Sequence, residues 1–589
     1  MPVNTERRQY AFSSYRLDSV SRELFGPDGA VIPVAAKALD VLAYLIEQRH
    51  RVVDKDDLLA TVWAGRIVEE NNLTQAISAL RKAFGVRAPE HRFIITISGR
   101  GYRFVAQVRE VEPADDDIPL ESRHTALAVL PFRLLSPEPR DELLELGLAE
   151  TLITRLSRVR RLRVRALASS ERFVRGALRD PDAAGRQLGA AYVVDGSAQR
   201  VDGRIRVNVR LLSVADGTTV WADTMDTSAE RVFALQDRIS GAVVRALALP
   251  PGAMSERARR TGDRGDAEVY RTWLHGYHLL QRPDETNLTE ALSAFRRAID
   301  LDTSYTRAYA GMALAYRGLV HLDHEPDDMF AMAKAAVAKA INIDANSPEA
   351  LVSQGRNRDL YDWDWVGAET SLQQAIELNP SLMEAHLAYA HLLVDLGRFD
   401  EGLEQACQAR ELDPLSPMVN ALYAGFLTAA GQSGAARKLI QRALELNPGF
   451  WIALQIRAGI AMDHGDANAA IEDMALAAER SHRVSQILAM QAIIHANAGD
   501  AARPQAILGE LEARRAGGYV PATSFAAVHV ARNNPEAALD ELERAYREHD
   551  IRMAFLKVDA RWNKLRRQPR FQTLAQRLGL ASERGYCRL

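Results

Sequence analysis

The strongest constraint on the fold of this chain is a repeat of 34 residues in its C-terminal half. The pairs Asn379-Pro380, Asp413-Pro414 and Asn447-Pro448 recur at this interval. The same period relates small residues, namely Gly397, Gly431, Gly465, Gly499, Ala375, Ala409, Ala443 and Ala477. Alanine lets two antiparallel helices approach closely, glycine turns the chain between them, and proline is tolerated where the next helix opens. The repeat therefore predicts helix pairs stacked into an all-α solenoid.

Further positions match a known repeat motif. They are Ala291, Phe295, Ala298, Tyr309, Met312, Ala313 and Tyr316, and less closely Leu387, Tyr389 and Ala390. In these residues the segment resembles tetratricopeptide (TPR) repeats, with about eight units between Tyr270 and His549. We expect a TPR solenoid over residues 268–550 and a C-terminal capping segment over 551–589. The concave face of such a solenoid is expected to receive a protein or peptide partner.

Two weakly structured joins divide the chain into three parts. Val111–Asp117 is acidic and contains a proline, and Pro250–Asp266 is rich in Pro, Gly and charged residues. We therefore expect linkers over residues 107–123 and 249–267. A chain of 589 residues exceeds what one hydrophobic core organises, and 47% apolar residues is typical of folded proteins. The sequence predicts a multidomain protein.

Composition argues against several classes of protein. No apolar run reaches the roughly 18 residues of a membrane-spanning helix, and the first residues lack the apolar core of a signal peptide. The two cysteines, Cys407 and Cys587, provide neither a disulfide framework nor a metal-binding quartet. We expect a cytoplasmic protein.

Residues 8–106 read as two strands, three helices and a final hairpin. The first helix is expected over residues 36–48, and the second follows an N-cap at Asp54. The third helix is expected over 71–84 and the hairpin over 93–105, with its tip at Ser98–Gly101. This order predicts a small α+β domain of the winged helix-turn-helix type.

The third helix has an apolar stripe and a polar face. Leu73, Ile77, Leu80 and Phe84 share one side, which we expect to face the core. Amides and basic groups on the other side can pair with base edges in a major groove, and an arginine at a hairpin tip can enter a minor groove. The candidate DNA-binding residues are Asn71, Asn72, Thr74, Gln75, Ser78, Arg81, Lys82, Arg100 and Tyr102.

Local charge favours this interpretation. The chain has a formal net charge of −3, yet residues 71–106 contain six Lys and Arg against one Glu. Positive charge thus gathers where the phosphates of DNA would lie. Helical periodicity by itself is typical of any amphipathic surface helix. Arg81 could instead pair with a carboxylate, and Tyr102 could be a core residue.

Three strings in this part resemble a known family: RVVDKDDLL from Arg51, LTQAISALRK from Leu73 and SGRGYRF from Ser98. They resemble the OmpR/PhoB-type winged helix. The resemblance implies that the third helix recognises promoter half-sites, with a dimer on DNA, and that the loop Ala64–Val68 contacts RNA polymerase. Fewer than ten residues precede the module, so we expect a regulator without a receiver domain, of the CadC and HilA kind.

Residues 124–248 predict a small α/β domain. Leu127–Phe132 reads as a buried strand and Arg204–Leu212 alternates as a strand, while Asp202-Gly203 and Asp216-Gly217 are hairpin turns. In Leu127–Phe132, Gly147, Leu148, Leu152, Ile153, Gly196 and Ser197 the segment resembles the TolB amino-terminal and FlgO-like modules. The resemblance implies a sensory or assembly role.

No catalytic motif emerges from the sequence. His275 and His278 are spaced to share a metal, but no third ligand lies near them, so ordinary helix packing explains them better. We expect no enzyme activity, no cofactor and no metal. The leading hypothesis is a DNA-binding transcription regulator that receives a protein, peptide or small-molecule signal through its middle domain and solenoid. A TPR scaffold whose winged helix docks a protein is the alternative.

Overall fold

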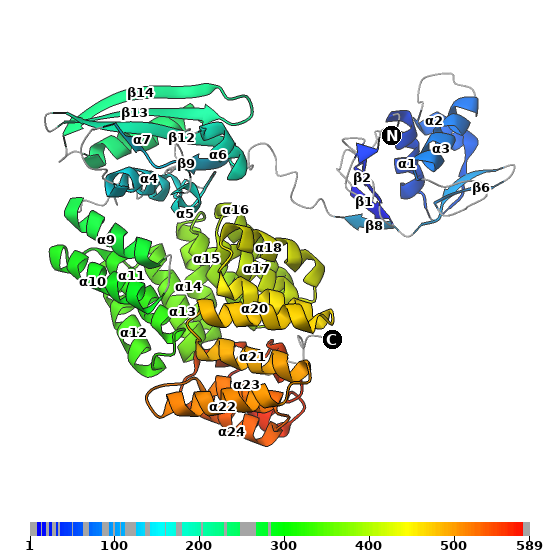
Figure 1. Cartoon of the computed structure of the whole chain (residues 1–589). Helices are drawn as coiled ribbons and strands as arrows, with labels where there is room; N and C mark the ends of the chain where they lie inside the picture. The colour runs from blue at the N-terminus through cyan, green and yellow to red at the C-terminus, as the bar shows by residue number, and fades with distance from the viewer. Residues whose placement is uncertain are drawn as a thin grey trace. The chain divides into compact units, whose positions relative to one another are not determined.

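A computed structural model describes residues 9–12, 15–18, 23–25, 31–32, 34, 36–49, 51–62, 70–84, 93–97, 100–106, 108–111, 125–135, 142–159, 161–171, 173, 180–201, 204–228, 232–247, 267–280 and 284–580. The chain divides into two compact units, Met1–Arg123 and His124–Leu589. Figure 1 colours both units along the chain. Each is described below by itself.

The first unit packs three helices between two small sheets. The helices are α1 (Ala36–Glu47), α2 (Lys55–Val62) and α3 (Glu70–Ala83). One sheet has the strand order β4-β3-β2-β1-β8, built from β1 (Gln9–Phe12), β2 (Tyr15–Asp18), β3 (Glu23–Phe25), β4 (Val31–Ile32) and β8 (Val108–Val111). The other has the order β5-β7-β6, built from β5 (Val53–Asp54), β6 (Ile94–Ile97) and β7 (Gly101–Phe104). The predicted helices and hairpin are present.

The end of this unit differs from the prediction. Residues 107–123 were expected to be a linker, but β8 pairs antiparallel with β1, so that Phe12 lies opposite Val108. The sequence of β8, VREV, does not alternate as a half-buried strand would. Its partner β1 lies about a hundred residues earlier, so the local sequence does not predict the pairing. The first unit therefore extends at least to Val111.

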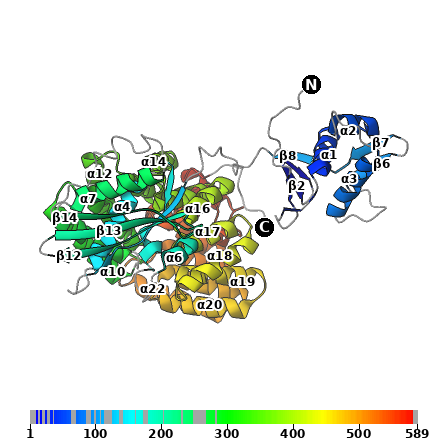
Figure 2. The same ribbon diagram turned by 90° about the horizontal axis from the view of Figure 1, so that it is seen from above.

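The second unit begins with a sheet of mixed direction in the order β11-β9-β12-β13-β14, to which β10 adds through β12. Its strands are β9 (Thr125–Val129), β10 (Arg133–Leu134), β11 (Leu162–Val164), β12 (Tyr192–Val201), β13 (Arg204–Ser213) and β14 (Thr219–Ser228). Its helices are α4 (Glu142–Leu156), α5 (Leu167–Glu171), α6 (Pro181–Gln187) and α7 (Val232–Ala246). The long antiparallel strands β12, β13 and β14 run side by side in Figure 2. This is the α/β domain that the sequence predicted.

A run of antiparallel helix pairs follows. The helices are α9 (Ala267–Leu280), α10 (Glu285–Leu301), α11 (Thr306–Val320), α12 (Pro326–Ile343), α13 (Pro348–Asn357), α14 (Trp365–Leu378), α15 (Met383–Asp395), α16 (Phe399–Leu412), α17 (Pro417–Ala429), α18 (Ser433–Leu446), α19 (Trp451–Asp463), α20 (Ala467–Arg480), α21 (Ser485–Asn497), α22 (Ala502–Arg515), α23 (Ala522–Ala531) and α24 (Pro535–Arg547). A π-helical turn, η3 (Arg358–Asp362), lies between α13 and α14. The predicted TPR-like solenoid is confirmed.

The repeated glycines and alanines act as the sequence predicted. Gly397, Gly431, Gly465 and Gly499 end the first helix of a pair with φ between +76° and +87°, a conformation that favours glycine. The four alanines at the same period are fully buried. The repeated prolines act differently. Pro380, Pro414 and Pro448 follow the C-cap residue and lie in the turn, so they stop one helix instead of opening the next.

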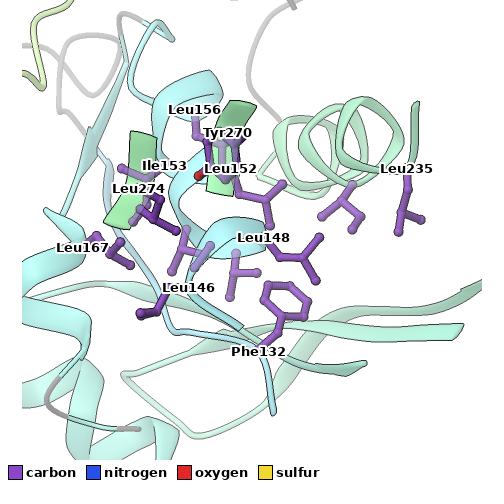
Figure 3. Packing of buried hydrophobic residues seen from close by; sticks show 14 of the residues in the cluster. Phe132, Leu146, Leu148, Leu152, Ile153, Leu156, Leu167, Leu235, Tyr270 and Leu274 are labelled. Carbon is purple, nitrogen blue, oxygen red and sulfur yellow. The ribbon is translucent and has the colours of Figure 1, made fainter. Parts of the chain in front are cut away.

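The α/β domain and the first repeats share one hydrophobic core. Leu148, Leu152 and Leu156 of α4 pack with residues of the sheet, of α7 and of α9. Figure 3 shows Tyr270 and Leu274 of α9 beside this α4 cluster. A Cβ on Gly147 would come within 2.9 Å of the Tyr270 ring, whose hydroxyl donates to the Gly147 carbonyl oxygen at 3.1 Å. The absent side chain at residue 147 is what allows the two parts to join.

The turns after α14 and α16 contact the same domain. The Leu415 N–H donates to Ser169 Oγ at 3.0 Å, and Ser169 in turn donates to the Asp413 carboxylate. Arg163 on β11 donates to the Pro380 carbonyl oxygen at 3.1 Å. Two of the three repeated turns, Asn379-Pro380 and Asp413-Pro414, thus contact the α/β domain.

The C-terminal segment does more than cap the last repeat. It comprises η4 (Ile551–Phe555), η5 (Ala560–Trp562) and α25 (Pro569–Arg577). Phe571 and Leu574 pack with α24, as a cap would. The Lys557 ammonium also donates to the Leu396 carbonyl oxygen at 2.9 Å, and the Trp365 indole donates to the Leu578 carbonyl oxygen at 2.7 Å. The segment therefore also contacts the middle repeats.

Candidate nucleic-acid interface

Helix α3 is held in the first unit by its apolar side. Leu73, Ile77 and Leu80 are at most 2% exposed and share the module core with α1. The last turn is anchored by Phe84, whose ring packs against Phe12, and whose carbonyl oxygen accepts a hydrogen bond from the Tyr15 hydroxyl at 3.1 Å. Because this stripe is buried, the opposite side of α3 must face solvent.

The exposed face of α3 carries part of the predicted recognition set. The side chains of Thr74, Gln75 and Ser78 are exposed on it. Hydroxyls and an amide can donate to and accept from base edges or phosphate oxygens in a major groove. Asn71, Asn72 and Lys82 lie on the described backbone of α3, and their side chains are outside the described residues.

Arg81 lies at the flank of this face and points to the wing. Its guanidinium donates to the Ile94 carbonyl oxygen at 2.9 Å and to Thr96 Oγ1 at 2.8 Å, both on β6. It pairs with no carboxylate among these described contacts. Arg81 therefore sets the position of the hairpin relative to α3.

The hairpin of β6 and β7 forms the wing. Arg100 is exposed at its turn, where its N–H donates to the Ile97 carbonyl oxygen at 3.0 Å. Ser98 and Gly99 of the predicted tip lie outside the described residues. Gly101 passes so close to β5 that a Cβ would stand 2.0 Å from the Val53 carbonyl oxygen. The glycine that follows the tip is thus required for packing of the wing.

Tyr102, a candidate DNA contact in the sequence, and its neighbour Arg103 have opposite environments on β7. Tyr102 is only 6% exposed and belongs to the core of the module, so we remove it from the set of DNA contacts that we propose. Arg103 is exposed on the same strand, and its guanidinium donates to the Arg49 carbonyl oxygen at 3.2 Å. The alternation of β7 carried the signal, because residues 102 and 103 must point to opposite sides of the strand.

Three further features were considered in the sequence: a histidine pair, the loop Ala64–Val68 and membrane-spanning segments. His275 is exposed on α9. Within the described ranges, no three His, Cys, Asp or Glu side chains come together as metal ligands would. The loop Ala64–Val68 lies outside the described residues. Over the part of the chain that the structure describes, no helix combines the length and the apolar character needed to cross a membrane.

Two family models match this chain. Residues 29–104 match the family described as transcriptional regulatory protein, C terminal, which covers the core of the winged helix. Residues 122–242 match the HilA/YgeH-like transcriptional regulator, second domain. The chain joins an OmpR/PhoB-type winged helix to a HilA-like domain. This second match covers the segment whose residues resemble the TolB-type modules.

The chain is also similar to whole regulators. It is 24% identical to the transcriptional regulator HilA of Salmonella typhi over 419 residues, which covers 70% of this chain and 72% of that protein. It is 28% identical to the putative adenylate cyclase 3 of Rhizobium meliloti, over 38% of each chain. Among solved structures, the DNA-binding domain of Escherichia coli CadC matches 18% of this chain and its own full length, with 21% identity and a TM-score of 0.17. Of these three matches, the one that covers most of this chain is to a transcription regulator.

Proposed function

We propose that this protein is a transcription regulator that binds promoter DNA through α3 and the β6–β7 wing. The observation that carries the proposal is the exposed polar face of Thr74, Gln75 and Ser78 on a helix whose other side is locked into the core. The family match of the same module supports it. Asn71, Asn72, Lys82 and Arg100 complete the proposed contact set. The protein acts in the cytoplasm, where DNA-binding regulators of bacteria meet their promoters.

The test is binding of the full-length protein to DNA fragments selected from genomic DNA. A variant with Gln75→Ala and Lys82→Ala should bind about ten- to hundredfold more weakly, because a lost bidentate base contact alone costs roughly 1–3 kcal/mol. Its dependence of log Kd on log salt should also become less steep by about one, for the phosphate contact of one lysine. Unchanged affinity and unchanged slope would refute the assignment of α3.

A matched control uses the same residue types in the second unit. Gln432 and Lys438 are exposed beside and on α18. A variant with Gln432→Ala and Lys438→Ala removes the same amide and the same positive charge from the solenoid. It should bind DNA with the affinity and the salt slope of the unaltered protein.

The second unit is proposed to receive the signal that controls this module. A large surface made of helix pairs suits a protein or peptide. We further propose that the loop Ala64–Val68 contacts RNA polymerase and that two copies bind adjacent half-sites. Enzyme activity forms no part of the proposal, since the family matches are to regulators.

The alternative is a scaffold in which the winged helix docks a protein. The solenoid is the observation that favours it, because stacked helix pairs commonly bind proteins. The salt series described above separates the two functions. A scaffold would show weak retention on DNA with a slope near zero, whereas a DNA-binding regulator loses affinity steeply as salt rises.

A further inference from the structure

A cavity of about 150 Å³ lies where the α/β domain meets the first repeats. Its wall is formed by α4 of the domain and by α9, α11, α13 and α15 of the solenoid. These four solenoid helices are the first members of successive pairs, so the cavity occupies the inner face of the solenoid under α4. Two parts of the chain must come together before this space exists.

Acidic groups dominate one side of the cavity. Arg307 donates to Glu150 at 2.8 Å, stands 3.7 Å from Glu349 and stacks 3.7 Å over the Trp273 ring. A third lining carboxylate, Glu384, accepts from the Tyr277 hydroxyl at 3.1 Å. Burial raises the pKa of Glu150 and of Glu384. Arg307 is thus the one guanidinium near the carboxylates of Glu150, Glu349 and Glu384 in these contacts. Such a partly buried acidic group favours binding of a positively charged ligand group.

A buried cation lies on another part of the same wall. Arg317 is 6% exposed, and among the described residues its guanidinium donates only to neutral oxygens, those of Ser353 and Asn357, at 3.1–3.4 Å. Burial lowers the pKa of Arg317 to about 9. A buried guanidinium without a carboxylate is costly, and a ligand carboxylate would supply the bidentate partner that it lacks.

The size and the remaining walls restrict the ligand further. A single water needs roughly 10–15 Å³ of such space, so the cavity has room for about ten non-hydrogen atoms. Leu280, Leu314 and Leu382 provide apolar surface between the polar groups. A molecule with one negative end, one positive end and an apolar side group matches this lining.

From these observations we propose that the cavity binds a small zwitterion, an α-amino acid with an apolar side chain. Its carboxylate pairs with Arg317, and its ammonium group pairs with Glu384 and Glu349. The site deepens the signal-receiving role proposed for the second unit and rests on it. Because the ligand would contact both α4 and the solenoid, its binding stabilises their association.

The experiment is thermal unfolding of the full-length protein, without DNA, in the presence of each of the twenty common amino acids at about 1 mM. At least one apolar amino acid should raise Tm, because a ligand that binds the folded state alone stabilises it. The Kd of that amino acid is then measured by calorimetry. Its N-acetyl derivative and its carboxamide should each bind at least tenfold more weakly, since each lacks one of the two charges.

Two variants locate the site. Arg317→Met should weaken binding of the amino acid about ten- to hundredfold, the size expected for loss of a charged hydrogen-bonding partner. Leu314→Trp, at a lining position that is 41% exposed, narrows the space without disturbing the core and should weaken binding to a similar degree. Arg437→Met, at an exposed position on α18, removes a guanidinium elsewhere and should leave Kd unchanged.

Three results would overturn the proposal. They are the absence of any stabilising amino acid, equal binding of the blocked derivatives, and wild-type affinity in the Leu314→Trp variant. Since DNA is absent from every measurement, such a failure leaves the DNA-binding assignment standing. Conversely, loss of DNA binding in the α3 variant has no bearing on occupancy of the cavity.

Discussion

Arg81 on α3 and Thr96 on β6 are joined by a hydrogen bond of 2.8 Å from the guanidinium to the hydroxyl oxygen. The same guanidinium reaches the Ile94 carbonyl oxygen. Helix α3 and the β6–β7 wing, through which DNA binding is proposed, are therefore linked by the side chain of Arg81. This residue looks like a DNA contact in the sequence and acts as a brace in the fold.

Replacing Arg81 with Met should lower the free energy of unfolding of the first unit by about 1–2 kcal/mol, because a charged donor to two acceptors is lost. Thr96→Val removes one acceptor and should cost less. Urea unfolding of the full-length protein measures both. Arg100→Met, at the exposed turn, should leave stability within about 0.5 kcal/mol and reduce the salt slope of DNA binding by about one. If Arg81→Met reproduced this second pattern, Arg81 would be a phosphate contact.

Gly101 should not tolerate a side chain. Gly101→Ala places a Cβ against the Val53 carbonyl oxygen and should destabilise the first unit by about 1–3 kcal/mol through forced displacement of β5 or β7. DNA binding should weaken with it, because the wing moves. Gly434→Ala, where a Cβ would meet nothing within 4 Å, serves as the control and should not destabilise the protein. Equal stability of the two variants in urea would contradict the packing given for β5 and β7.

The shared core predicts that the α/β domain and the first repeats unfold together. Leu274 on α9 is fully buried beside α4, and Leu274→Ala should cost about 2–5 kcal/mol. Hydrogen exchange measures the free energy of opening for individual amides. This free energy should fall equally in the sheet domain and in α9–α11. Leu301→Ala, at a position that is 44% exposed on α10, should shift neither by much. A shift confined to the helices would show that the two parts unfold independently.

His391 should make the second unit sensitive to acid. Burial lowers the pKa of His391 from 6.5 to about 3 in the folded chain. Below pH 6.5, His391 therefore binds a proton in the unfolded chain but not in the folded chain. The free energy of unfolding falls until the pH reaches about 3. Between pH 7 and pH 5 the loss should be roughly 1–2 kcal/mol for this group.

The matched test compares His391→Gln with His275→Gln. The first variant should lose less stability between pH 7 and pH 5 than the unaltered protein, because the titrating group is gone. His275 is exposed on α9, so its replacement should leave the pH dependence as it was. Identical pH profiles for all three proteins, measured by urea unfolding at the two pH values, would rule out this origin of acid sensitivity.

Most of the elements could be predicted because their cause is local. A stripe such as Leu73, Ile77 and Leu80 predicts the buried side of α3, and the period that relates Gly431 to Gly465 predicts the helix pairs. The strand β8 could not be predicted in this way. Its four residues have no strong alternation, and only the distant partner β1 makes them a strand.

The candidate site shows the same division. The sequence places Gln75 and Ser78 on a polar helical face, because helical geometry alone decides which residues share a side. It could not tell whether Arg81 reaches DNA or Thr96, since that depends on how closely β6 approaches α3. Nor could it reveal the cavity, whose charged groups come from residues as far apart as Glu150 and Glu384.

The sequence by itself determined the order of the parts, the helical repeat and the polar face of α3, because periodicity and turn chemistry act over a few residues. Only the tertiary structure decided that Tyr102 belongs to the core, that Arg81 braces the wing, and that Arg317 lines a cavity beneath α4. Burial and hydrogen-bond partners are properties of chain segments brought together in space, and a linear pattern does not contain them.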